Sequence, residues 1–354
     1  MRNKWMIYGA NGYTGRLVAA EAVRRGLRPT LAGRSAEPIE RLARELGCPS
    51  RVFALEERAA ENLSGMKVVL HCAGPFSATA RPMVDACLRA ATSYLDITGE
   101  IDVIEMAAAR DAEARRAGVS VIPAVGFDVV PSDCLAATLH EALPAATRLT
   151  LAFSSTGGLS PGTAKTSLES MPHGGRVRID GKIVRVPMGW KTREVDFPEG
   201  RRGAVTIPWG DVASAYHSTG IPNIEVYVAM PPAQIRSLRR WRWLLPLAGV
   251  GIVQRFARRR IERTVPGPSA EELAESRASF WGRAEDAAGR AAEATLVTTG
   301  GYPLTVQTAL IFVEAALSGG LPVGFSTPSR ALGKDVITRV PGSRLAWLRR
   351  PEGS

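Results

Sequence analysis

The chain has few cysteines, few histidines and few aromatic residues. Four cysteines occur in 354 residues, and they are too far apart to form a C-x-x-C pair. This spacing gives no metal-ligand pattern and no sign of a disulfide framework. We therefore expect free thiols in a reducing compartment and no metal site.

An uncharged run long enough to cross a bilayer is also missing. The most apolar stretch, residues 243–253, is far shorter than the roughly 20 residues that a membrane-spanning helix needs. Residues 1–8 lead directly into a predicted strand and a glycine turn, which leaves no room for a cleavable leader. The expected location is cytoplasmic, with peripheral contact to the cytoplasmic membrane as an alternative.

Acidic residues are fewer than basic ones, 34 against 45, and the net charge is +11. Such a charge fits an anionic partner, either a nucleic acid, a membrane surface or an acidic carrier protein, but does not choose among them. The length and the 45% hydrophobic content are sufficient for two domains. We expect the first domain over residues 1–130 and a second domain over 131–321.

A glycine turn follows the first predicted strand and opens a predicted helix. The spacing is G-x-x-G-x-x-G, a variation of the dinucleotide-binding fingerprint. In this context glycines let a pyrophosphate approach the backbone N–H groups at the positive end of the helix dipole. The predicted cofactor-binding residues of this turn are Gly9, Ala10, Asn11, Gly12, Tyr13, Thr14 and Gly15.

The second predicted strand ends in Gly33, Arg34 and Ser35, where an NAD-binding domain would place an acidic residue. A guanidinium group there pairs with the 2′-phosphate of NADP and stacks on adenine. We therefore predict NADP(H) as the cofactor, bound by Arg34 and Ser35. The alternative is an exposed arginine at a strand end.

Strands and helices continue to alternate over the first 130 residues, which predicts an α/β fold with a doubly wound, Rossmann-type parallel sheet. The strand at 68–72 runs into Ala73, Gly74, Pro75 and Phe76 at the carboxyl edge of the sheet, where ligands bind. These four residues are predicted to lie against the nicotinamide ribose. His71, inside the same strand, is predicted to be a buried structural histidine.

Polar residues follow at the ends of the next strands, and they supply candidates for chemistry: Tyr94, Asp96, Glu100 and Asp128. Ser132 and Asp133 are predicted to cap the helix that begins beside them. In the second half, residues 176–185 predict a hairpin with Asp180 and Gly181 at its turn. Residues 160–167, which include Lys165, open a helix and face the cleft or cap that helix.

Four of these motifs together resemble the saccharopine dehydrogenase-like family, and most of all its trans-acting enoyl reductase branch. The motifs are residues 9–15, 73–76, 94–100 and 126–133, and two later ones, 300–302 and 324–328, are similar too. The resemblance implies a Rossmann domain followed by an α/β substrate domain, with residues 322–354 returning to pack on the first domain. It also implies reduction of a carbon–carbon double bond in an acyl chain carried by a polyketide synthase.

For that reaction the sequence predicts Tyr94, Lys165 and Asp96 as catalytic residues, with Tyr94 and Lys165 favoured. A tyrosine hydroxyl can donate a proton, and a lysine ammonium can balance an enolate. Two alternatives stay open. One is a saccharopine-type amino-acid dehydrogenase, and the other is a lipid-associated binding protein that holds NADP without turnover.

Residues 236–260 combine arginines with Trp241, Trp243 and an apolar stretch. This composition is typical of an interfacial membrane anchor, which would bring an acyl thioester or lipid substrate to the cleft. A buried helical hairpin and a homodimer contact are the alternatives. Nucleic-acid binding is not expected, because no nucleic-acid module surrounds the segment.

Overall fold

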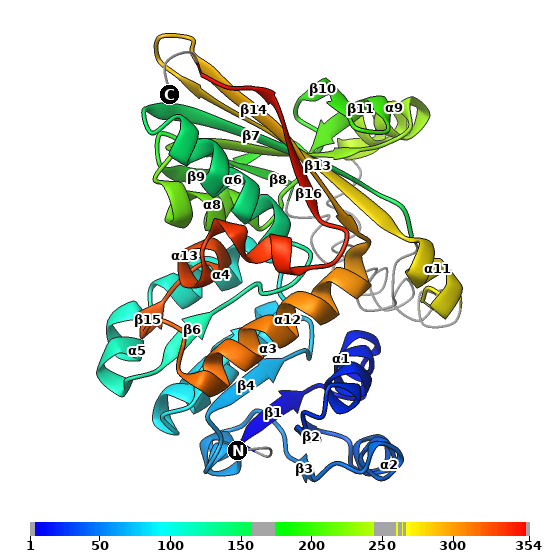
Figure 1. Ribbon diagram of the computed structural model, residues 1–354, viewed down its shortest axis with the longest axis vertical. Coiled ribbons are helices and arrows are strands. Elements are labelled where there is room, and N and C mark those ends of the chain that lie inside the picture. Colours follow the sequence, from blue (N-terminus) through cyan, green and yellow to red (C-terminus); the bar gives the residue numbers. More distant parts are fainter. Residues whose placement is uncertain (1–3, 158–173, 244–259, 261–263, 265–266, 352–354) are drawn as a thin grey trace. The chain divides into compact units, whose positions relative to one another are not determined.

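The computed structural model describes residues 4–157, 174–243, 260, 264 and 267–351 (Figure 1). The chain divides into two compact units. The first unit comprises residues 1–130 and 302–332, and the second comprises residues 131–301 and 333–354.

The first unit is built on a seven-stranded sheet with the order β15-β6-β5-β4-β1-β2-β3, in which the paired strands are parallel. Strands β1, β2 and β4 are buried along their whole length, as expected for a parallel sheet covered on both faces. The predicted α/β class is confirmed. The strands are β1 (Trp5–Tyr8), β2 (Thr30–Gly33), β3 (Ser50–Val52), β4 (Val68–His71), β5 (Ser93–Asp96), β6 (Ser120–Ile122) and β15 (Gly324–Phe325).

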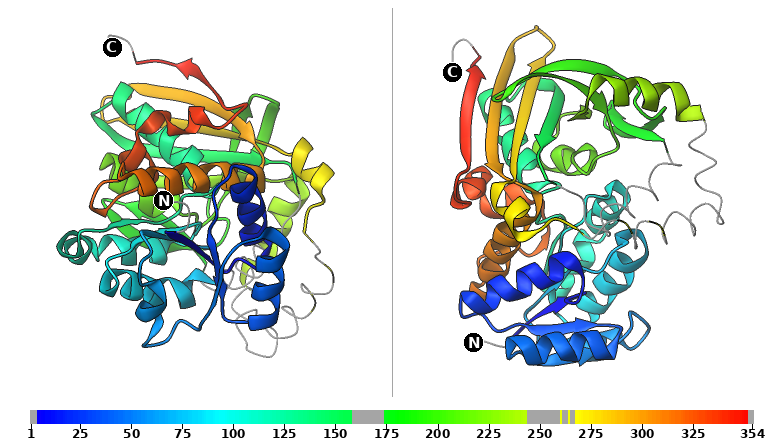
Figure 2. Two further views of the ribbon diagram at one scale, coloured as in Figure 1. Left: turned by 60° about the horizontal axis from the view of Figure 1, so that its bottom comes forward. Right: turned by 90° about the vertical axis from the view of Figure 1, so that its right-hand side faces the viewer.

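Helices connect these strands, and α1 and α2 lie side by side (Figure 2). Helices α2 and α5 each end at a glycine in the left-handed conformation, Gly47 and Gly118, where a side chain would be strained. The helices are α1 (Tyr13–Arg24), α2 (Ala36–Leu46), α3 (Phe76–Arg89), α4 (Ile101–Ala108), α5 (Asp111–Ala117), α12 (Gly301–Ser318) and α13 (Pro328–Leu332), with a 3-10 turn at Ala59–Leu63.

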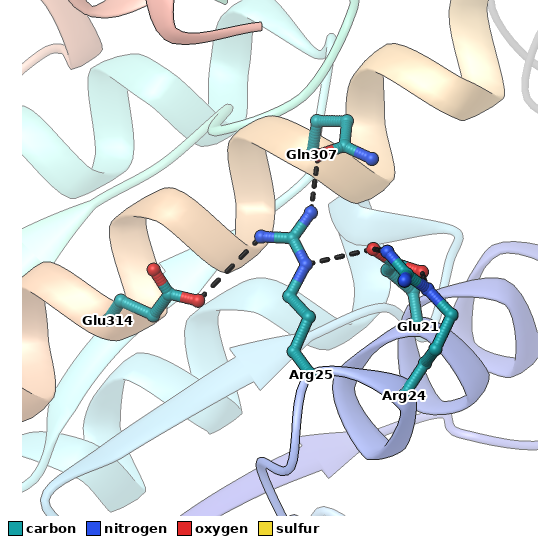
Figure 3. Close-up of polar contacts among 5 residues, drawn as sticks. All are labelled: Glu21, Arg24, Arg25, Gln307 and Glu314. Atoms are coloured by element: carbon teal, nitrogen blue, oxygen red, sulfur yellow. Dashed lines mark hydrogen bonds and ion pairs between the residues drawn. The ribbon is translucent and has the colours of Figure 1, made fainter. Parts of the chain in front are cut away.

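Helix α12 reaches the first unit from far along the chain and is held there by Arg25 (Figure 3). The Arg25 guanidinium donates to Gln307 and lies 3.6 Å from the carboxylate of Glu314, both on α12. It also pairs with Glu21 at 2.8 Å, on the helix that Arg25 follows. One half-buried cation therefore joins the carboxyl end of α1 to α12.

The second unit carries a mixed sheet with the order β10-β11-β12-β7-β13-β14-β16, to which the β8–β9 hairpin is added beside β12. Strands β7 and β12 are parallel, and the other pairs are antiparallel. The strands are β7 (Ala146–Ser155), β8 (Gly175–Ile179), β9 (Lys182–Val186), β10 (Thr192–Phe197), β11 (Gly200–Thr206), β12 (Asn223–Ala229), β13 (Arg277–Asp286), β14 (Ala291–Thr299) and β16 (Arg344–Arg349).

The predicted hairpin is present, since β8 pairs with β9 and both turn residues, Asp180 and Gly181, have positive φ. Ser132 hydrogen-bonds Asp211, and Asp133 bonds Ser218, so these two polar residues join α6 to α8. The helices of this unit are α6 (Val130–Ala142), α8 (Asp211–Thr219), α9 (Pro232–Trp241) and α11 (Ala270–Glu275), with a 3-10 turn at Lys334–Arg339.

The end of the chain differs from the expected arrangement. Residues 302–332, not 322–354, return to the first unit, where β15 pairs with β6. Residues 333–354 belong to the second unit, because β16 pairs with β14. Along β16 exposed residues alternate with half-buried ones, a pattern typical of an antiparallel strand with one face covered and not of the buried central strands of the first sheet.

Two predictions fall on residues that the structure does not describe. Lys165 lies outside the described residues, as does the rest of the segment 158–173. Most of the apolar part of the basic segment, residues 244–259, lies outside them too. Among the described helices, none has both the length and the apolar character needed to cross a membrane.

Candidate functional site

The glycine turn between β1 and α1 is shaped by two glycines that admit no side chain. Gly9 has φ +82°, and a Cβ placed there would lie 2.7 Å from the Ala73 nitrogen. A Cβ on Gly15 would overlap the Gly9 oxygen. The backbone of Gly9 therefore packs between α1 and the loop after β4, and the turn cannot open to accept larger residues.

The other residues of the turn present an anion-binding surface. Asn11 and Gly12 are exposed, and α1 begins at Tyr13 with no side-chain cap and no acidic residue in its first turn. A Cβ on Gly12 would meet only the Gly9 oxygen, at 3.3 Å. N–H groups at a helix N-terminus beside an open backbone suit the pyrophosphate of a dinucleotide.

The remaining predicted residues of this turn pack it against β2, α1 and α12. Ala10 is buried, and its N–H donates to the Ala32 carbonyl at 3.1 Å. Thr14 is half-buried in the first turn of α1. The Tyr13 ring meets the edge of Tyr302, on α12, with centroids 4.9 Å apart.

Arg34 and Ser35 follow the carboxyl end of β2, and both are exposed. Within the described part of the chain, no carboxylate lies within ion-pair distance of Arg34. The Asn11 side chain lies over Gly33, so the glycine turn and the end of β2 adjoin one another. A guanidinium group beside this turn suits the additional phosphate that distinguishes NADP from NAD.

Residues 73–76 form the loop from β4 into α3. The Thr79 hydroxyl donates to the carbonyls of Ala73 and Pro75, at 2.6 and 3.0 Å, and so fixes the loop. Gly74 is exposed, and Phe76 is buried at the first position of α3. The exposed backbone beside Gly74 is the part of this loop that the nicotinamide end of a bound cofactor could reach.

Tyr94 and Asp96, both predicted as catalytic residues, are fully buried. The Tyr94 hydroxyl donates to Asp96 Oδ2 at 2.7 Å, and the N–H groups of Thr98 and Ala124 donate to Oδ1 at 2.9 and 2.7 Å. Burial raises the pKa of Asp96 to about 6. These hydrogen bonds join the ends of β5 and β6.

His71 is buried as predicted, and burial lowers its pKa to about 3. It lies against Tyr94, with Nδ1 3.3 Å from the hydroxyl. The uncharged ring is part of the core beneath the loop that follows β4.

Two half-buried carboxyl groups lie where the strands end, Glu100 after β5 and Asp128 after β6. Glu100 Oε1 accepts from the N–H of Phe76 at 3.0 Å, so this carboxylate caps α3 and touches the loop of residues 73–76. The carboxylate thus lies at the positive end of the α3 dipole.

Asp128 packs against the backbone of Gly99, where a Cβ would lie 2.5 Å from Oδ2. Burial, and secondly the charge of Glu100, raise the pKa of Asp128 to about 7. The neighbouring Phe127 N–H donates to Thr305 on α12 at 3.0 Å. The first unit thus holds a carboxyl group whose pKa is raised to near neutral pH, beside the charge of a second one.

Comparisons with known proteins support the cofactor assignment. Residues 5–122 match the family model described as the saccharopine dehydrogenase NADP-binding domain. Over these residues the chain is similar to the saccharopine dehydrogenase-like family. The matched domain indicates NADP(H), and the turn, the uncapped α1 and Arg34 fit that cofactor.

Two similar proteins illustrate the range of this family. The chain is 32% identical to a mouse saccharopine dehydrogenase-like oxidoreductase over 154 residues, 36% of this chain and 35% of that protein. It is 34% identical to a trans-acting enoyl reductase of Mycobacterium tuberculosis over 145 residues, 36% of this chain and 33% of that protein. The alignments span about a third of the length of these relatives.

Among solved structures, the saccharopine dehydrogenase (L-Glu forming) of Saccharomyces cerevisiae has a TM-score of 0.66 over 99% of this chain and 100% of that chain. The sequence identity is 13%, so this similarity shows the fold. Both the parallel sheet and the mixed sheet belong to that fold.

Proposed function

We propose that this protein is an NADP-dependent oxidoreductase that reduces the carbon–carbon double bond of an enoyl thioester. The observation that carries the proposal is the Asp128 carboxyl, which follows β6 in the unit whose residues 5–122 match an NADP-binding domain, and whose pKa is raised to about 7. The similarity to a trans-acting enoyl reductase supports the substrate class.

NADPH, when bound, supplies a hydride, which the substrate accepts at its β-carbon. Gly9 and Gly15 keep the turn tight, Gly12 would leave space for the pyrophosphate, and Arg34 would pair with the 2′-phosphate. The exposed backbone at Gly74 would receive the nicotinamide ring. These residues bind and orient the cofactor, and none of them exchanges a proton.

Asp128 donates its proton to the α-carbon as the enolate collapses, and it becomes a carboxylate. Since the side chain is half-buried, it regains a proton from water after each turnover. Glu100 raises the pKa of Asp128 by its charge and stays fixed on the N–H of Phe76. A general acid is most effective when its pKa lies close to the working pH.

The decisive experiment follows NADPH oxidation with a short enoyl thioester and, separately, NADP⁺ reduction with saccharopine. The proposal predicts turnover of the enoyl thioester only. Turnover of saccharopine would show instead that the protein is an amino-acid dehydrogenase. Cofactor binding without either activity would indicate a non-catalytic binding protein.

The pH dependence of the reduction rate tests the role of Asp128 as the proton donor. We expect the rate to be constant below pH about 7 and to fall about tenfold per unit above it, because only protonated Asp128 can donate. Asp128→Asn is expected to remove this decline along with most of the activity.

Glu100→Gln is expected to shift the decline to lower pH, because it removes the charge that helps to raise the pKa of Asp128. Tyr94→Phe leaves the profile in place, and a profile that follows Tyr94 instead would contradict the assignment.

A further inference from the structure

Helix α9 presents an unusual surface in the second unit, and the NADP site does not use it. Two large apolar side chains, Trp241 and Trp243, are 49% and 68% exposed. Two exposed tryptophans so close together at a helix end are unfavourable in water and mark an interaction surface. The surface made by Arg236, Arg239, Arg240, Trp241, Arg242 and Trp243 is called here the α9 surface.

The inner side of α9 is fixed to the sheet, so the α9 surface has a defined orientation. Ile235 is buried, and Leu238 packs towards Gly189. Figure 1 shows α9 beside β10 and β11. At about 100° per residue, Arg236, Arg240 and Trp241 fall on the sides of the helix that face away from Ile235. The side chains that point outward therefore include two cations and an indole.

The charge of the α9 surface is of one sign. Arginine occurs four times in residues 236–242, and residues 232–243 include no acidic residue. Among the residues that the structure describes, no carboxylate lies within 4.0 Å of these guanidinium groups. Arg240 lies over the ring of Trp241, 5.5 Å from its centroid. The cations are not neutralised within the described unit and are available to an anionic partner.

A groove of about 530 Å³ runs between α9 and the strands β10 and β11. Arg236 and Arg239 line it from the helix, and Arg193 lines it from β10. Glu194, the acidic residue of the groove, lies 3.9 Å from Arg201 on the neighbouring strand. Three arginines against one paired carboxylate suit a phosphate group rather than an uncharged ligand.

We propose that the α9 surface docks on a membrane of anionic phospholipids, with its indoles at head-group depth and its arginines on lipid phosphates. Indole rings prefer the interface, because one edge is apolar and the N–H is polar. Guanidinium groups bind phosphate with a planar pair of donors. A nucleic acid or an acidic protein would also satisfy the arginines, but an anionic bilayer offers phosphates for the cations directly beside an apolar layer for the two indoles.

The inference goes beyond the proposed reductase, and its test needs no activity. The full chain is sedimented with vesicles of phosphatidylcholine containing about 30% phosphatidylglycerol, and with phosphatidylcholine alone. We expect binding to the anionic vesicles at low salt, a marked loss at high salt, and little binding to the neutral vesicles.

Double variants test whether vesicle binding depends on the α9 surface. Arg236→Gln with Arg240→Gln is expected to weaken binding by about 25-fold, at about fivefold for each arginine near an anionic surface. The control is Arg344→Gln with Arg349→Gln, which removes the same charge from exposed positions of β16 and leaves binding within about twofold. Trp241→Ser with Trp243→Ser is expected to abolish binding, whereas Leu348→Ser, at another exposed apolar residue, is not.

Equal losses in the α9 and β16 variants would overturn the proposal, because net charge would then be the cause. No sedimentation with anionic vesicles would also overturn it. Inorganic phosphate is the third probe: if millimolar phosphate saturates the arginine groove and vesicles do not compete, the groove serves a free phosphate compound and the membrane proposal is wrong. Circular dichroism of every variant separates loss of binding from loss of fold.

Discussion

At the scale of single residues, the Asp96 carboxyl shows how burial determines the role of a polar group. It receives hydrogen bonds from Tyr94, Thr98 and Ala124 and reaches no solvent. Replacing it by alanine leaves two backbone N–H groups without this acceptor, each costing about 1–3 kcal/mol. A proton donor to a substrate needs access, and the half-buried Asp128 has it.

The raised pKa of Asp96 leads to a prediction about stability. The native carboxyl binds its proton more tightly than the unfolded one, with its pKa raised from 3.8 to about 6. The free energy of unfolding therefore decreases as pH rises from about 4 to about 6 on account of this group. We expect Asp96→Asn to remove that slope, measured by urea unfolding at several pH values.

Because Asp128 also has a raised pKa, both proteins in this comparison should carry Asp128→Asn. An unchanged slope after Asp96→Asn in that background would show that Asp96 stays ionised over the whole range.

Arg34 leads to a prediction about cofactor choice. Arg34→Ala should weaken NADPH binding at least about tenfold and leave NADH binding nearly unchanged, since a charge-assisted pair to phosphate contributes about 1.5–3 kcal/mol. Fluorescence titration measures both. Arg41→Ala, an exposed arginine on the neighbouring α2, is the matched control. A similar loss for the two cofactors would argue against a 2′-phosphate contact.

At the scale of elements, the turn between β1 and α1 contains one glycine expected to matter for cofactor binding and another expected to matter for the stability of the fold. Gly12→Val should abolish binding of both cofactors in a folded protein, because Gly12 faces open space apart from the Gly9 oxygen. Gly15→Ala should instead destabilise the fold, since its Cβ would overlap that oxygen. Thermal unfolding with and without NADPH distinguishes the two. A stable Gly15→Ala protein would mean that the helix shifts at little cost.

The elements that sequence predicts best are those determined by local contacts. Turn glycines and alternating strands predicted the parallel sheet, and the hairpin at Asp180 was equally local. The position of Tyr94 was harder to foresee. A strand covered on both faces buries its side chains, so Tyr94 and Asp96, inside β5, are enclosed, whereas Glu100 and Asp128 lie beyond strand ends.

Contacts between segments far apart in the sequence could not be predicted in the same way, because no local sequence pattern indicates them. Thr305 accepts from the N–H of Phe127 across 178 residues, and Thr308 donates to the carbonyl of Val125. Nothing in the local pattern of residues 302–321 ties them to the first unit, and the sequence assigned them to the second. The loop that carries Asp128 is therefore positioned by a helix whose partnership is visible only in the fold.

At the scale of the whole molecule, residues 333–354 complete the second sheet and permit a truncation test. A chain ending at Leu332 loses β16 and the buried Val336, Ile337 and Val340. Burying an aliphatic side chain contributes about 1.5–3 kcal/mol, so we expect a loss of about 5 kcal/mol or more and aggregation through the exposed edge of β14.

Calorimetry and size-exclusion chromatography measure this loss, and NADPH titration reports separately on the first unit, which keeps all its strands. A control ending at Arg350 retains β16. Unchanged stability of the shorter chain would show that β14 tolerates a free edge.

The chain passes between the two units three times, after residues 130, 301 and 332. This path has a consequence for synthesis on the ribosome. When residue 130 emerges, strands β1 to β6 of the first sheet exist, but α12 and β15 have not been translated. The nascent cofactor domain must wait for residues 131–332, with the loop of Asp128 lacking its support, before it can close. Completion of the first unit is thus coupled to translation of the whole intervening stretch of the second unit.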